Sequence, residues 1–180
     1  MADVLVLCTG NSCRSQMAQT FLQAFLPEGN KVYSAGVNPK PVHPMTVQVM
    51  REEGFDVSAN QSNHVDELSS INFAWILTVS ETAQEKGPIW VKFGNVIHKQ
   101  FFDPSKAVGT EDERLAVFRN VRDEIKAFCK DFVKNPSAEA DDSQVPEHKR
   151  SSRKPRLRKM INYYVGQLSG RSLSNQGKFA

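Results

Sequence analysis

A cysteine and an arginine six positions apart are the first residues of the chain whose types and spacing suggest chemistry. Cys8 and Arg14 frame a loop-like segment, Cys-Thr-Gly-Asn-Ser-Cys-Arg-Ser, at residues 8–15. A loop at a helix N-terminus points several backbone N–H groups at one centre and adds the partial positive charge of the helix dipole. Arg14 adds a planar fork that can hold two oxygens of an anion. The spacing therefore predicts a site for a tetrahedral oxyanion.

The positive field of such a loop favours a thiolate over a thiol, so Cys8 is the predicted nucleophile. A bound oxyanion would place its central atom against the sulfur. Gly10 is expected to supply the positive φ at which the loop curls, while Asn11 and Ser15 have suitable side chains to hydrogen-bond the thiolate. The predicted oxyanion-binding residues are Thr9, Gly10, Asn11, Ser12, Cys13, Arg14 and Ser15.

A purely structural role for Cys8 is the main alternative, because a cysteine that ends a strand is usually a small buried hydrophobic residue. The position of Arg14 favours the functional interpretation. An arginine that opens a helix opposes the helix dipole unless an anion is bound nearby.

Hydrophobic periodicity predicts the elements that position this loop. Residues 4–8 form a wholly apolar run, as in a strand buried on both faces of a parallel sheet, and helical spacing follows over 17–25. The other predicted elements are strands at 31–35, 73–79 and 95–102 and a helix at 45–53. Strands that alternate with helices predict an α/β fold of three layers, with a four-stranded parallel sheet between helices on both faces.

The last helix of the predicted domain is the best marked. Thr110 and Glu113 have the spacing of a capping box, and apolar residues then recur at helical spacing as far as Phe132. The period is lost from Asn135 onward. We therefore predict a catalytic domain at 1–134, followed at 135–180 by a linker and a basic tail in which 156–168 could form a short helix.

The net charge of +3 conceals two unlike parts. Residues 146–180 hold nine lysines and arginines and one acid, whereas residues 1–145 carry a net charge of −5. We interpret the basic cluster at 149–159 as a solvated tail in preference to an element that binds nucleic acid or an acidic surface.

Three cysteines are too few and too irregularly spaced for a secreted disulfide scaffold or a zinc site. The first residues lack the features of a signal peptide, and no apolar run reaches the ~18 residues of a membrane span. We expect a cytoplasmic protein in a reducing compartment, with no metal, cofactor or membrane partner. We also expect a monomer.

The segment Cys-Thr-Gly-Asn-Ser-Cys-Arg-Ser-Gln-Met-Ala at 8–18 resembles the signature loop of the low-molecular-weight protein tyrosine phosphatase superfamily, in the form found in its arsenate reductase branch. Ser34-Ala35-Gly36, Phe102-Asp103-Pro104 and the segment 118–125 resemble the same branch, and Ser105-Lys106 replaces the tyrosine pair usual in the phosphatases. The likeness covers residues 3 to about 130 and implies the α/β fold predicted above.

The resemblance implies a role for three residues. Cys8 would be the nucleophile, Arg14 the oxyanion ligand and Asp103 the general acid that protonates the departing oxygen. Taken alone, an Asp-Pro pair is more often a turn initiator.

The thioredoxin-linked reductases of this family keep two further cysteines just after the third strand. The corresponding stretch here contains no cysteine, and Ser80 and Gly87 stand near the expected positions. Cys129 belongs to the apolar stripe of the last helix and is expected to be buried. Cys13 could form a reversible disulfide with Cys8 or pack beneath the loop.

The predicted function is therefore reduction of arsenate through an adduct on Cys8, which an external small thiol or a glutaredoxin-like protein resolves. The alternative is a protein tyrosine or small-molecule phosphatase that forms a phosphocysteine intermediate. A non-catalytic oxyanion-binding module comes last, because nothing in the loop is missing.

Overall fold

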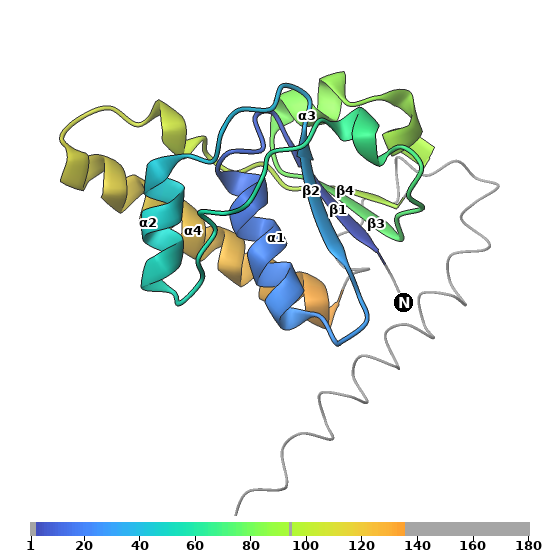
Figure 1. Ribbon diagram of the computed structural model, residues 1–180, viewed down its shortest axis with the longest axis horizontal. Coiled ribbons are helices and arrows are strands. Elements are labelled where there is room, and N and C mark those ends of the chain that lie inside the picture. The colour runs from blue at the N-terminus through green and yellow to red at the C-terminus, as the bar shows by residue number, and fades with distance from the viewer. Residues whose placement is uncertain (1–2, 94, 136–180) are drawn as a thin grey trace, which may run out of the picture.

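The computed structural model describes residues 3–93 and 95–135, so the predicted tail and its helix at 156–168 lie outside the described residues. Its strands are β1 (Val4–Cys8), β2 (Val32–Gly36), β3 (Trp75–Thr78) and β4 (Val96–His98). They form one parallel sheet in the order β2-β1-β3-β4, with β1 in the interior (Figure 1). This confirms the predicted four-stranded parallel sheet.

Alternate residues of β1 point to opposite faces of the sheet, which explains its uninterrupted apolar sequence. Val4, Val6 and Cys8 belong to the larger apolar core, whereas Leu5 and Leu7 belong to a smaller core on the other face. The sheet is thus buried on both sides, as the apolar run predicts.

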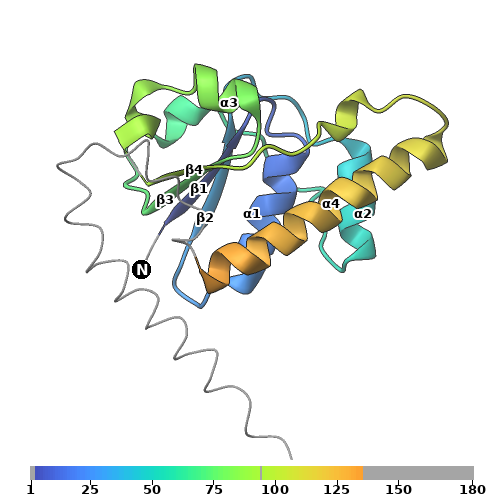
Figure 2. The ribbon, with the colours of Figure 1, turned by 180° about the vertical axis from the view of Figure 1, so that it is seen from behind.

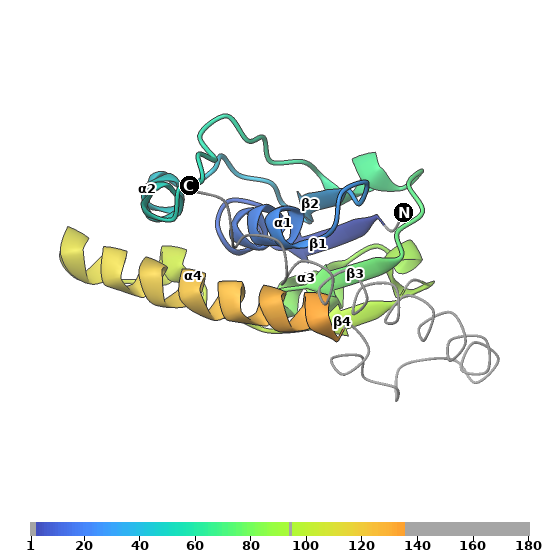
Figure 3. The ribbon, with the colours of Figure 1, turned by 90° about the horizontal axis from the view of Figure 1, so that it is seen from below.

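Three long helices cover the larger core: α1 (Arg14–Phe25), α2 (Pro44–Glu52) and α4 (Glu111–Lys134). Figure 2 shows α4 running past α1 and α2. Figure 3 shows the C-terminal end of α4 on the side of β3 and β4, and there Phe132 packs edge-on against Trp75 of β3. The opposite face carries α3 (Glu81–Lys86) and the short 3₁₀ helices η1 (Val65–Leu68) and η2 (Ile89–Phe93). The predicted three-layer α/β fold, with helices on both faces, is confirmed.

The start of α4 forms the predicted capping box. Thr110 Oγ1 accepts from the Glu113 N–H at 3.3 Å, and the Glu113 carboxylate accepts from the Thr110 N–H at 2.7 Å. These bonds satisfy amides that would otherwise lack a partner at the helix N-terminus. A third 3₁₀ helix, η3 (Pro104–Lys106), lies just upstream of α4.

Ion pairs fasten α2 to α4. The largely buried Arg122 of α4 donates to the Val49 carbonyl and to the Glu52 carboxylate, both at 3.0 Å. Arg119 approaches Glu52 at 2.7 Å, and Lys126 pairs with Glu53. This network fixes the position of α2. The segment that leads from β2 to α2 packs against the loop at residues 9–13.

In the part of the chain that the structure describes, no helix combines the length and apolar composition that a membrane crossing requires.

Candidate active site

The loop at residues 9–13 joins β1 to α1 at the carboxyl end of an interior strand. The chain leaves β1 for β2 on one side and later returns to β3 on the other, and ligands of open α/β sheets bind at such a reversal. Gly36, at the end of β2, allows the loop to approach closely. A Cβ at this position would lie 2.8 Å from the Thr9 carbonyl oxygen and 3.0 Å from the Asn11 nitrogen.

The carbonyl groups of the loop are bound by the segment that follows β2. Backbone N–H groups at 37, 38 and 40 donate to the carbonyls of residues 8, 9 and 10 at 3.2, 2.8 and 2.8 Å, and the His43 N–H donates to Ser12 at 3.0 Å. Several loop N–H groups find no acceptor among the described residues: Gly10, Ser12, Cys13, Arg14 and Ser15. The loop thus engages its carbonyls on the protein side and keeps its N–H groups available for an anion.

The prediction that Gly10 supplies the positive φ is wrong, because Asn11 adopts it with φ = 49°. Asparagine tolerates the left-handed region better than most residues, since its short polar side chain can bond locally. Asn11 is fully buried, and its Oδ1 accepts from the Asn63 N–H at 2.9 Å. The loop therefore turns at a residue whose side chain also ties it to the rest of the fold.

The Cys8 sulfur has two close polar neighbours. The Asn11 N–H donates to Sγ at 3.0 Å, and Ser15 Oγ lies 2.9 Å from it. The contact predicted for the Ser15 side chain is present, whereas the one predicted for the Asn11 side chain is not: that side chain donates to Ser15 and Ser34, and the backbone N–H of Asn11 bonds the sulfur instead. Cys8 is 2% exposed, so the loop and its neighbours enclose the thiol almost completely.

Arg14 brings a distant segment to the loop. Its Nη1 donates to the Phe101 carbonyl at 3.1 Å, and its Nη2 lies 3.0 Å from Asp103 Oδ2. The second oxygen of Asp103 accepts from the N–H of Ser105 at 3.2 Å and from its hydroxyl at 2.7 Å. Asp103 is therefore both a turn-capping residue and a carboxylate held at Arg14. The structure thus pairs two of the predicted catalytic residues, Arg14 and Asp103, and the loop that begins after Cys8 leads directly to Arg14.

The chain matches the family described as Low molecular weight phosphotyrosine protein phosphatase over residues 3–143. The chain belongs to this family. An arsenate reductase of Shouchella clausii is 42% identical over 132 residues, which cover 72% of this chain and 94% of that protein. A solved arsenate reductase in its oxidized state is 26% identical with a TM-score of 0.62, and covers 73% of this chain and 95% of its own. Another, in a phosphate-binding state, has 25% identity and a TM-score of 0.59, with coverage of 73% and 96%.

All three cysteines of this family member are free and buried. Burial raises the pKa of the Cys13 thiol, although a hydrogen bond with the Thr46 side chain opposes the shift. Cys13 thus packs within the loop and forms no disulfide in this structure. Cys129 is fully buried, as predicted, and burial raises its pKa as well.

Residues 79–88, the stretch without a cysteine, contain α3. Ser80 begins the helix: its Oγ accepts from the Ala83 N–H at 3.3 Å and lies 3.2 Å from Thr9 Oγ1. Gly87 ends the helix. A Cβ at this position would lie 2.7 Å from the Ala83 carbonyl oxygen and 3.4 Å from a Leu7 methyl group. This backbone therefore has room for a side chain at 80 and none at 87.

Sequence reasoning missed the polar residues that support the loop from behind. Gln16 is fully buried and donates to the Asn11 carbonyl at 2.9 Å and the Gln61 carbonyl at 3.2 Å. The Ser62 hydroxyl donates to the same Asn11 carbonyl at 2.7 Å. The available signal for such a role was Gln16 itself, a polar residue that directly precedes Met17 on the buried side of a predicted helix.

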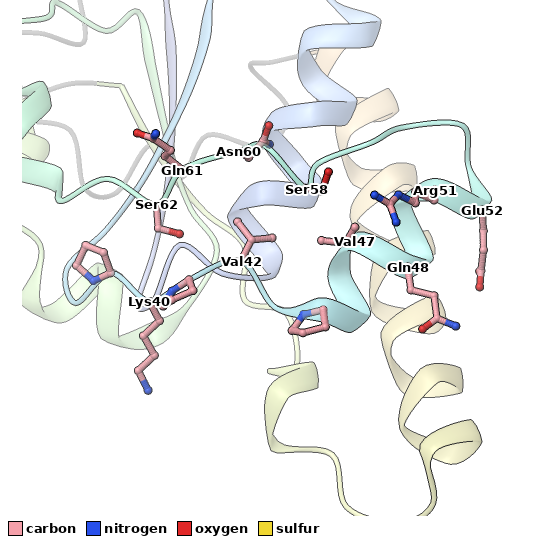
Figure 4. Close-up of a pocket in the computed structure, with 13 residues that line it drawn as sticks. Lys40, Val42, Val47, Gln48, Arg51, Glu52, Ser58, Asn60, Gln61 and Ser62 are labelled. Carbon is pink, nitrogen blue, oxygen red and sulfur yellow. The ribbon is translucent and has the colours of Figure 1, made fainter.

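An open groove lies behind this support, between α2, residues 39–44 and residues 58–62 (Figure 4). Gln61 and Ser62 form part of its wall, whereas none of the predicted catalytic residues lines it. No cluster of three or more histidine, cysteine, aspartate or glutamate side chains able to hold a metal is found within residues 3–93 and 95–135.

Proposed function

We propose that this enzyme reduces arsenate to arsenite through a covalent adduct on Cys8, in the reducing cytoplasm. The observation that carries the proposal is the sulfur's position within the loop: Sγ accepts from the Asn11 N–H at 3.0 Å, beside loop N–H groups that have no acceptor among the residues that the structure describes. Relatives named arsenate reductase match this chain over 94% of their own length, which supports the same reaction.

In the first step, the Cys8 thiolate attacks the arsenic of arsenate, and a sulfur–arsenic bond forms. An arsenic–oxygen bond breaks, and the departing oxygen takes a proton from Asp103, which is in its carboxylic acid form once arsenate has replaced it at Arg14, and leaves as water. Arg14 and the loop N–H groups hold the remaining oxygens and their negative charge. Arsenic is still As(V) in the adduct.

In the second step, an external thiolate attacks the Cys8 sulfur. A disulfide forms, the sulfur–arsenic bond breaks, and its electron pair stays on arsenic, which leaves as arsenite, As(III). A second external thiol then reduces the mixed disulfide and restores Cys8. The balance is one arsenate and two thiols converted to one arsenite, one disulfide and one water.

An external thiol is proposed because no second cysteine of the chain is placed to attack Cys8 from outside the loop. Cys129 is fully buried and its thiol points to the Ala18 carbonyl at 3.8 Å. A small thiol, or a glutaredoxin-like protein, supplies the electrons instead.

The catalytic test uses two substitutions. Cys8→Ser is expected to abolish arsenite formation and to keep oxyanion binding, since the proposed ligands are N–H groups and Arg14. Asp103→Asn is expected to slow turnover by roughly 10²–10⁴-fold, the usual span for a lost general acid. Near-normal turnover of Cys8→Ser would sink the mechanism, and a change below threefold would leave Asp103 only its capping role.

The electron donor is tested by measuring arsenite formation with thioredoxin, with a small thiol, and with a small thiol plus a glutaredoxin. Thioredoxin alone is expected to support little turnover, because it needs an accessible disulfide. Efficient turnover with thioredoxin that disappears in Cys129→Ser would identify Cys129 as a resolving cysteine and contradict the proposal.

Hydrolysis of a phosphate ester is the second candidate function. It needs only a thiolate, Arg14 and an acid, and it leaves a phosphocysteine that water hydrolyses. The absence of a cysteine from residues 79–88 favours this reading. Release of phosphate from p-nitrophenyl phosphate, with no arsenite from any donor, would replace the first proposal by this one.

A further inference from the structure

The two carboxylate oxygens of Asp103 have different partners. Oδ2 lies 3.0 Å from Arg14 Nη2, whereas Oδ1 accepts from the N–H of Ser105 at 3.2 Å and from its hydroxyl at 2.7 Å. The contact at Oδ2 belongs to the proposed oxyanion site, since Arg14 is the ligand that the substrate needs. The proposed mechanism does not use the Ser105 hydroxyl.

In the proposed reaction, substrate binding takes away the partner of one oxygen and leaves the partners of the other in place. When arsenate replaces Asp103 at Arg14, Oδ2 loses its donor. Arg14 itself stays attached to the fold, because its Nη1 donates to the Phe101 carbonyl at 3.1 Å. Oδ1 keeps both of its bonds, since neither bond from Ser105 involves Arg14. Ser105 is therefore the residue that still holds the carboxyl group once the substrate is bound.

The backbone at Asp103 keeps Ser105 within reach of the carboxyl group. Asp103 caps η3 with φ = −84° and ψ = 101°, an extended conformation that a following proline favours. Pro104 is buried, and its side chain anchors the turn. The Ser105 hydroxyl therefore meets Oδ1 within a short and well-fixed turn, and it can follow the carboxyl group through the change of partner at Oδ2.

The two bonds from Ser105 determine which oxygen carries the proton when Asp103 is in its acid form. In a carboxylic acid the carbonyl oxygen is the better acceptor, and the protonated oxygen is a donor. Two donors point at Oδ1, so Oδ1 is the carbonyl oxygen and the proton is on Oδ2. Oδ2 is the atom that contacts Arg14 before the substrate binds. Its proton consequently faces the position that the oxyanion takes.

We propose that Ser105 is a positioning residue whose hydroxyl holds the Asp103 carboxyl group and directs its proton toward the substrate through Oδ2. The proposal rests on Asp103 being the general acid of the proposed function. In that step the O–H bond at Oδ2 breaks, and a new O–H bond forms on the departing oxygen. Asp103 is left as a carboxylate that still accepts from Ser105, and Ser105 itself gains and loses no proton.

The test compares three substitutions. Ser105→Ala removes the hydroxyl and keeps the backbone bond that caps η3, whereas Ser105→Thr keeps a hydroxyl at an exposed position with room for a methyl group. Ser58→Ala is the matched control. The Ser58 N–H donates to Asp56 Oδ1 at 2.9 Å, so this exposed turn has the same spacing, and its carboxylate pairs with Arg51 far from the loop at residues 9–13.

The readout is kcat/KM for arsenate at saturating thiol, so that formation of the adduct limits the measured rate. Ser105→Ala is expected to lower it by roughly threefold to tenfold, as the loss of one hydrogen bond implies. Ser105→Thr is expected to restore most of the loss, and Ser58→Ala to keep the wild-type value. A Ser105→Ala value within twofold of the wild type, or no recovery in Ser105→Thr, overturns the proposal.

A double variant separates positioning from a general effect on the fold. In an Asp103→Asn background there is no acid to direct, so Ser105→Ala is expected to lower the remaining turnover no further. A merely structural role would give the same loss in both backgrounds, and that result would overturn the proposal. The affinity of Ser105→Ala for inorganic phosphate, measured by calorimetry, is expected to stay within twofold of the wild type.

Failure of the proposed reaction is distinguished from failure of this proposal by a second substrate. If the wild type forms no arsenite with any donor, the same variants are compared in the hydrolysis of phenyl phosphate, whose departing oxygen also needs a proton. A loss in Ser105→Ala that Ser105→Thr restores would then support the role of Ser105 in a phosphatase, and no loss would overturn it. A wild type with neither activity would overturn both proposals.

Discussion

Asn11 carries both the backbone turn and the side-chain support of the loop. Its φ is 49°, its side chain bonds Asn63, Ser15 and Ser34, and its N–H donates to the Cys8 sulfur. One residue thus couples the shape of the loop to the surroundings of the thiol.

Replacing Asn11 with glycine and with alanine separates these two roles. Asn11→Gly keeps the left-handed backbone and loses the side-chain bonds, whereas Asn11→Ala loses both. We expect both variants to lose most turnover, and alanine to be less stable than glycine by about 1–2 kcal/mol. Urea unfolding measures the difference. Equal stability of the two variants would mean that the backbone turn has relaxed.

Gly36 and Gly54 provide a matched pair for the close approach of β2 to the loop. Gly36→Ala pushes a methyl group against the Thr9 carbonyl, so we expect turnover to fall by about 10-fold to 100-fold, as for a misplaced site. Gly54 has φ = 83° and open space around its Cα. Gly54→Ala should cost about 1 kcal/mol of stability through backbone strain and leave turnover intact. The reverse pattern would contradict this account of the loop.

His43 makes stability depend on pH. Its Nδ1 accepts from the Met45 N–H at 3.1 Å and caps α2, which requires an unprotonated nitrogen. Burial lowers its pKa below 6.5, the nearby Arg114 lowers it further, and Asp103 opposes the shift. Because the pKa is lower in the folded state, this stabilisation is present above pH 6.5 and is lost as pH falls through the folded value.

Substitution of His43 by asparagine is expected to keep the helix cap and to remove this titration. The melting temperature of His43→Asn should therefore decline less than that of the wild type between about pH 7 and pH 5. Melting curves at several pH values measure the two slopes. Parallel curves would show that His43 does not contribute to the pH dependence.

At the scale of elements, the contact between α2 and α4 carries the next prediction. Arg122 lies in that contact with its side chain 8% exposed. Arg122→Met leaves Glu52 and Glu53 with fewer cationic partners, and removal of one member of a buried ion pair costs about 3–5 kcal/mol. Arg51→Met breaks only the exposed pair with Asp56 and should cost less than about 1 kcal/mol. Urea unfolding of both variants tests the contrast, which would fail if the losses were equal.

The elements that sequence patterns predict well are those with enough residues to show a period. β1, α1 and the capping box of α4 were all evident. The six-residue α3 and the 3₁₀ helices were missed, because one or two turns contain too few apolar positions. β4 is shorter than the predicted strand at 95–102. Phe101 is buried but lies outside the sheet, and its carbonyl accepts a hydrogen bond from Arg14.

The same limit applies to the candidate site. Cys8 and Arg14 share one short segment, so their spacing alone predicts the loop, and Asp103 was placed by family resemblance. Asn63 and Ser34 contact Asn11 from positions far along the chain, and no local pattern records such contacts. The positive φ at Asn11, predicted for Gly10, also depends on Asn63. The hydrogen bond from the Asn63 N–H to the Asn11 side chain offsets the cost of the left-handed backbone.

At the scale of the whole molecule, the last buried residues of the described core precede the predicted basic tail. Phe132 and Val133 are buried and end the apolar face of α4. We expect a chain that ends at residue 135 to melt cooperatively within a few degrees of the full chain and to keep its turnover. Calorimetry and the arsenite assay measure both. A large fall in melting temperature would place part of 136–180 in the folded domain.

Gly87 also bears on how this chain could acquire an internal disulfide relay, whether in evolution or in the laboratory. Ser80→Cys exchanges one side chain for another at a position with room. Gly87→Cys collides with the backbone of its own helix, because the new Cβ would lie 2.7 Å from the Ala83 oxygen. Ser80→Cys and Gly87→Cys therefore differ in their effect on the stability of α3. The backbone at the C-terminal end of α3 has to change first. Introducing only the two cysteines would destabilise the helix without providing a working disulfide relay.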